Sequence, residues 1–104
     1  MILVSTENIE GVKIIKTLGL VRGNTVRARN IGRDIFASLR NLVGGEIDEY
    51  TRLLSDAREE SLNRMQDEAE KLGADAVVNI RFTTSTVMQG CSEILAYGTA
   101  VQTE

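Results

Sequence analysis

The chain has 104 residues, a mass of 11.4 kDa and a formal net charge of −3, which predicts one domain over residues 1–104. Its acidic balance and dispersed basic residues argue against a nucleic-acid partner, because such binding needs an excess of Lys and Arg. No apolar stretch approaches the roughly 18 residues of a membrane span, and the first residues lack a signal-peptide pattern, so we expect no membrane partner and a cytoplasmic location.

Two segments near the N-terminus have the composition of strands. Residues Val12–Arg22 are rich in Val, Ile and Leu and lie between Gly11 and Gly23, which predicts a strand. We expect Gly23 to break this strand, with a brief resumption over Thr25–Asn30. A short strand is also predicted at Ile2–Val4.

Two helices are predicted in the middle of the chain. Arg33–Val43 carries apolar residues on one helical face, and Gly44 and Gly45 follow where a helix commonly ends. A longer helix is predicted over Asp48–Leu72, with Gly73 as its stop signal. Its apolar stripe consists of Tyr50, Leu54, Ala57, Ser61, Met65, Ala69 and Leu72. Such a helix is roughly 37 Å long, so we expect part of it to lie against a neighbouring subunit.

The C-terminal segment, Ala76–Gln102, has the pattern of a β-hairpin that turns at Gln89-Gly90. A two-residue turn would place Phe82 opposite Tyr97, whereas a bulged turn would shift the pairing by one residue. One face of the hairpin carries Val78, Ile80, Phe82, Leu95, Tyr97 and Val101. We expect the long helix to pack on that face.

The other face of the hairpin carries little charge. It consists of Val77, Asn79, Arg81, Thr83, Ser85, Val87, Ser92, Ile94, Ala96, Gly98, Ala100 and Gln102. A sheet face in contact with water normally carries more charged side chains, so this composition predicts burial against another copy of the chain. The alternative is a solvent-exposed surface rich in Thr and Ser.

Together, these elements predict an α+β fold in two layers, an antiparallel sheet with a C-terminal β-hairpin packed by one short and one long helix. Motifs spread over Ser5–Val101 also resemble those of the YbjQ-like family. The motifs are Asn30-Ile-Gly-Arg-Asp34, Arg40, Gly44-Gly45, Tyr50, Ala69, Gly73-Ala-Asp-Ala76, Gly90-Cys-Ser-Glu93 and Tyr97-Gly-Thr-Ala-Val101. The resemblance implies a dodecin-like subunit and a homopentameric ring in which extra short strands join the subunits. The family label proposes heavy-metal binding and brings no established activity.

Four polar residues within these motifs are the candidate ligand-binding residues, namely Arg33, Asp34, Arg40 and Tyr50. The neighbours Arg33 and Asp34 could line a ring interface or hold an anionic ligand through the guanidinium group. Alternatively, Asp34 marks the start of a helix, where the helix dipole favours negative charge. Both interpretations stay open.

Cys91 is the single cysteine of the chain and the candidate metal ligand. One thiolate cannot build a tetrahedral zinc site, but a ring could gather several copies of Cys91 around its axis for a soft metal ion. The alternative is a small, buried and unreactive thiol beside a turn. Acidic residues around the long helix match no calcium-loop spacing and are expected to face solvent; they are Glu46, Asp48, Glu49, Glu59 and Glu60.

Three functions from different classes remain. The first is a homo-oligomeric binding or scaffold protein without catalysis. The second is a metal-binding ring that uses Cys91 or carboxylates from several copies, with a metal ion as its cofactor. The third is an enzyme with a site between subunits. We expect no enzyme, because the chain contains no histidine, the side chain best suited to proton transfer near neutral pH.

Overall fold

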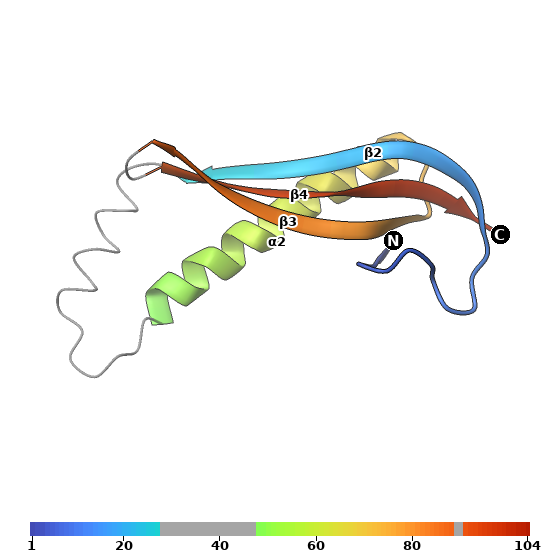
Figure 1. Ribbon diagram of the computed structural model, residues 1–104, viewed down its shortest axis with the longest axis horizontal. Coiled ribbons are helices and arrows are strands. Elements are labelled where there is room, and N and C mark those ends of the chain that lie inside the picture. Colours follow the sequence, from blue (N-terminus) through green and yellow to red (C-terminus); the bar gives the residue numbers. More distant parts are fainter. Residues whose placement is uncertain (28–47, 89–90) are drawn as a thin grey trace.

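The computed structural model describes residues 1–27, 48–88 and 91–104, and Figure 1 shows a helix crossing one face of a sheet. The strands are β1 (Ile2–Leu3), β2 (Ile14–Arg27), β3 (Ala76–Met88) and β4 (Cys91–Thr103), and the helix is α2 (Asp48–Lys71). The predicted α+β fold in two layers is confirmed. The short helix predicted over Arg33–Val43, with the glycines that follow it, lies outside the described residues.

The sheet has the strand order β1-β3-β4-β2 and is mixed. The three long strands are antiparallel, as predicted, but β1 runs parallel to β3, with Leu3 paired to Val77. The N-terminal segment continues along β3 beyond β1. The Val4 N–H donates to the Val77 carbonyl at 3.0 Å, and the Ile80 N–H donates to the Val4 carbonyl at 3.1 Å. This pairing covers the first part of the outer edge of β3.

The strand β2 runs from Ile14 to Arg27 without interruption, so the break predicted at Gly23 is wrong. Gly23 is instead the point where α2 lies directly against the sheet. A Cβ atom added there would overlap the carbonyl oxygen of Ser61 and the amide nitrogen of Met65. The missing side chain therefore allows the helix backbone to approach the strand.

The helix α2 ends within one residue of its predicted boundary. Gly73 has a φ of 78°, and its N–H donates to the Glu70 carbonyl while the Ala74 N–H donates to the Ala69 carbonyl. These two bonds form the glycine-dependent cap that satisfies the last carbonyls of a helix. The predicted stripe is buried at Ala57, Ser61, Met65 and Ala69, whereas Leu72 is 47% exposed.

A buried hydroxyl ties the helix to two strands. The Oγ of Ser61 lies 3.0 Å from the Thr25 hydroxyl of β2 and 3.0 Å from the Ile94 carbonyl of β4. It also lies 3.0 Å from the Ala57 carbonyl of its own helix. A hydroxyl can accept one bond while it donates another, so this polar group is satisfied within the core.

The strand β4 presents to α2 the face opposite to the one we predicted. Ala96 and Ala100 are fully buried and cluster with Met65 and Ala69 of the helix. The prediction that this face of the hairpin packs against another copy is therefore wrong for its β4 residues Ala96 and Ala100. Its small side chains serve the close approach of α2, and alternation places the larger Tyr97 on the other side of the strand.

The strand β3 changes sides at a bulge. Asn79 has a φ of 55°, a left-handed conformation that Asn tolerates better than most residues. Before the bulge, Val77 belongs to the cluster under α2 and Val78 to a second cluster on the opposite face; beyond it, Ile80 returns to the helix side. The prediction that the long helix packs on the hairpin face with Val78 and Ile80 is thus correct for Ile80 and wrong for Val78.

The hairpin connection has the predicted length, because β3 ends at Met88 and β4 starts at Cys91, to which Met88 is paired. A register shift follows between Thr86 and Met88, so Phe82 pairs with Ala96 rather than with the residue after it. This is the one-residue shift expected of a bulge near the turn.

The sheet face opposite α2 is covered at one end by the N-terminal loop. The second core cluster lies there and consists of Ala76, Val78 and Val101, packed by Val4, Ile9 and Ile14. No other described element covers that face, and its remaining part is exposed.

Candidate functional site

The predicted site residues fall where the structure says little about them. Arg33, Asp34 and Arg40 lie outside the described residues. Tyr50 belongs to the first turn of α2, and Cys91 is the first residue of β4, but neither side chain is described. All five residues stay predictions, and the structure does not test whether they come together.

The first surface of interest is the exposed part of the sheet opposite α2, which we call the open face. It consists of Leu20, Arg22, Asn24 and Val26 of β2, Arg81, Thr83 and Ser85 of β3, and Glu93, Leu95, Tyr97 and Thr99 of β4. Leu20 is 65% exposed and Val26 is 52% exposed, and Tyr97 between the outer strands is 37% exposed. The open face therefore offers large apolar side chains to a partner.

Polar side chains lie between the apolar ones on the open face. Tyr97 is paired with Arg22 of β2 and with Arg81 of β3, so the two arginines flank it. One row further along, the Asn24 Nδ2 donates to the Glu93 carboxylate at 3.1 Å. An aromatic residue beside arginines is typical of the centre of a protein interface.

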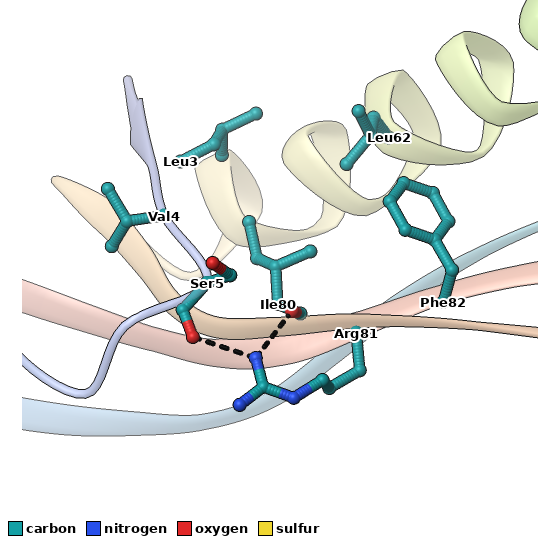
Figure 2. Close-up of a pocket in the computed structure, with 7 residues that line it drawn as sticks. All are labelled: Leu3, Val4, Ser5, Leu62, Ile80, Arg81 and Phe82. Atoms are coloured by element: carbon teal, nitrogen blue, oxygen red, sulfur yellow. Dashed lines mark hydrogen bonds between the residues drawn. The ribbon is translucent and has the colours of Figure 1, made fainter.

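The second surface of interest is a recess of about 410 Å³ at the outer edge of β3, which we call the edge pocket (Figure 2). It lies where the N-terminal segment leaves β3. Its apolar lining consists of Leu3, Val4, Leu62, Ile80 and Phe82, and its polar lining consists of Ser5 and Arg81.

Arg81 is fixed at the rim of the edge pocket by backbone carbonyls. Its Nη1 donates to the Ser5 carbonyl at 2.7 Å and to the Ile80 carbonyl at 2.9 Å. Figure 2 shows that Arg81 and Phe82 leave β3 on opposite sides. The edge pocket therefore has two sides. Its apolar side faces α2, and its cationic side, formed by Arg81, lies on the opposite side of β3 (Figure 2).

The sequence pattern did not reveal the edge pocket. Its walls come from the N-terminal segment, α2 and β3, which are far apart along the chain. The bulge at Asn79 brings Ile80 and Phe82 to the helix side, and an asparagine in a strand pattern is the one local signal that could have indicated a bulge.

Within residues 1–27, 48–88 and 91–104, no three Cys, Asp or Glu side chains come together as a possible metal site. The described residues of one chain therefore do not by themselves form a structural zinc site, which needs four ligands. In the same part of the chain, no helix is long and apolar enough to cross a membrane.

The described architecture defines a small α+β domain whose sheet has one face under a helix and one face that the described residues leave largely open. The family model described as "Putative heavy-metal-binding" matches residues 1–104, and the chain belongs to this YbjQ-like family.

The relatives agree with this membership. A UPF0145 protein of Dehalococcoides mccartyi is 59% identical over 104 residues, which is 100% of both chains. A UPF0145 protein of Halorubrum lacusprofundi is 61% identical over 102 residues, covering 98% of each. One from Archaeoglobus fulgidus is 60% identical and covers 98% of this chain and 94% of the relative.

A solved structure supports the fold. A protein of unknown function from Pediococcus pentosaceus, assigned to the DUF74 family, matches with a TM-score of 0.66. The match covers 100% of this chain and 98% of that chain at 16% sequence identity. At this level of identity the likeness concerns the fold alone.

Proposed function

We propose that this protein is a homo-oligomeric binding protein of the cytoplasm, without catalysis of its own, whose copies associate through the open face. The observation that carries this proposal is the exposure of Leu20, Val26 and Tyr97 on a sheet face that the described chain leaves uncovered. A two-layer domain normally buries the apolar face of its sheet against another layer. In this protein a second copy would supply that layer.

The family resemblance implies a closed ring of five copies. In such a ring, the open face of one copy would meet a different surface of the next copy, because an interface that joins unlike surfaces closes into a ring when the rotation allows it.

Leu20→Lys tests the interface. Because Leu20 is exposed in one chain, lysine should leave the subunit folded but place a charge in the apolar contact. We expect dissociation to smaller species in light scattering after gel filtration, with circular dichroism unchanged. Val26→Lys should act in the same direction.

Leu72→Lys is the matched control, because Leu72 is also an exposed leucine but lies at the end of α2, away from the open face. It should keep the mass of the native assembly. Dissociation by Leu72→Lys together with an intact Leu20→Lys assembly would show that the open face is not the interface.

Metal binding is the second candidate, favoured by the description of the family. Because the described part of one chain offers no cluster of three ligands, we propose that a soft metal ion would need Cys91 thiolates from several copies of the ring. Metal retained by the native assembly and lost in Cys91→Ala would support this candidate. Equal metal content in both proteins would exclude Cys91 as the ligand.

A further inference from the structure

We propose that the edge pocket binds a small amphiphilic carboxylate, with its apolar chain against the helix side and its carboxylate at the edge of β3. This inference rests on the proposed function as a binding protein and names the class of ligand. The site shares Arg81 with the open face, but its apolar lining, including Phe82, lies on the helix side of β3.

The apolar half of the site is formed by side chains that the fold leaves incompletely buried. Phe82 is 44% exposed, although it lies on the same side of the sheet as α2. Leu3 and Leu62 are also only partly buried against the core. A hydrocarbon chain in the recess would remove these three surfaces from water, which is the main source of affinity for an apolar group.

The cationic half of the site is Arg81, the one charged side chain among the described residues that line the edge pocket. Its hydrogen bonds to described residues come from Nη1, which donates to the Ser5 and Ile80 carbonyls. Toward the described part of the chain, the N–H groups of Nη2 and Nε stay available, and Arg81 has no carboxylate partner there. A guanidinium group held in place in this way is a preorganised partner for a carboxylate.

A backbone donor lies between the two halves. Successive N–H groups of a strand point to alternate edges, and the Ile80 N–H donates to the Val4 carbonyl at the outer edge. The Phe82 N–H consequently points out of the same edge, where the described chain gives it no acceptor. A carboxylate at this point could accept from Phe82 and face the Arg81 guanidinium.

The size and charge of the site favour a small ligand. The volume of about 410 Å³ lies near the lower end of the range for small-molecule sites. A neutral peptide strand added to the edge of β3 would use the backbone donors but would leave Arg81 without an anionic partner. The lone cation therefore argues for an acid with a short hydrocarbon chain.

Octanoate, hexanoate and octan-1-ol are the probes for this site. Titration of the methyl-labelled, assembled protein by NMR should show octanoate shifting the methyl signals of Leu3, Leu62 and Ile80. Each added methylene should strengthen binding by roughly two- to fourfold. Octan-1-ol should bind more weakly than octanoate, because it lacks the charge that Arg81 recognises.

Variants separate the two halves of the site. R81Q should weaken octanoate by about three- to tenfold and leave octan-1-ol unchanged, whereas R81K should retain most of the affinity. F82A should weaken both probes. R58Q is the matched control, since Arg58 is an exposed arginine on α2, and it should bind octanoate like the native protein.

Equal binding of octanoate and octan-1-ol, or equal octanoate binding by R81Q and the native protein, would overturn the proposal. Methyl shifts at positions away from the edge pocket would also overturn it. The Leu20→Lys variant separates this proposal from the oligomer, because a dissociated subunit should still bind octanoate. Loss of octanoate binding in that variant would show that the site is not contained in one chain.

Discussion

Replacement of Gly23 by valine is expected to destabilise the folded domain by about 3 kcal/mol or more. The first side-chain atom alone would overlap the backbone of α2 at Ser61 and Met65 and would lie 2.8 Å from the Cβ of Arg64. Backbone atoms cannot move aside as the end of a flexible side chain can. Overpacking costs about 1–3 kcal/mol when neighbouring side chains adjust, and we expect at least the upper end of this range because the helix itself must shift.

Urea denaturation followed by circular dichroism measures this effect. Lys16→Ala is the control, since Lys16 is exposed on the same strand and is not among the residues of the open face, and it should change the free energy of unfolding by less than about 0.5 kcal/mol. If Gly23→Val unfolds at the same urea concentration as Lys16→Ala, then α2 does not lie against β2 as described.

Replacement of Ala96 by aspartate should have an equally large effect. Ala96 is fully buried under α2, in the cluster with Met65 and Ala69. A carboxylate there would lose its hydration and gain no cation in return, and burial of an unpaired charge costs several kcal/mol. We expect the variant to be unfolded or insoluble near neutral pH.

Ser92→Asp is the matched control on the same strand, because Ser92 is exposed. Its thermal midpoint should stay close to that of the native protein. The Ala96→Asp variant also distinguishes two roles of the β4 face that carries Ala96 and Ala100, namely contact with α2 and contact with another copy. A folded Ala96→Asp subunit with an unchanged thermal midpoint but a dissociated assembly would show that this face meets another copy rather than α2.

The local pattern was sufficient to predict the long helix. The stripe through Ala57 and Met65 repeats at helical spacing, and Gly73 can adopt the left-handed conformation that closes the helix. Both signals are contained within a few residues, so the observed α2, Asp48–Lys71, differs from the prediction by one residue at its end.

The pattern was not sufficient to predict which sheet face α2 covers. A strand with period-two alternation has two faces, and we expected the helix on the face with the larger apolar residues, such as Tyr97. The helix lies instead on the face with Ala96 and Ala100, because close packing of a helix backbone needs small residues beneath it. The strand break predicted at Gly23 is wrong for the same reason. In a sequence pattern, a glycine required for close contact with a helix looks the same as a glycine that ends a strand.

The candidate site depends on contacts between distant segments. The edge pocket forms because the N-terminal segment pairs with β3 as far as Ile80 and then departs, and because Asn79 reverses the sides of the strand. No short motif encodes this combination. The residues that the sequence did single out, including Arg33 and Cys91, stay predictions.

Native mass spectrometry of the untagged protein tests the central claim that copies of this chain associate into a binding protein. We expect a species at a whole multiple of 11.4 kDa, with five copies if the family resemblance holds. Additional mass equal to a metal ion would favour the second candidate function. A single species at 11.4 kDa at micromolar concentration would contradict the proposed association.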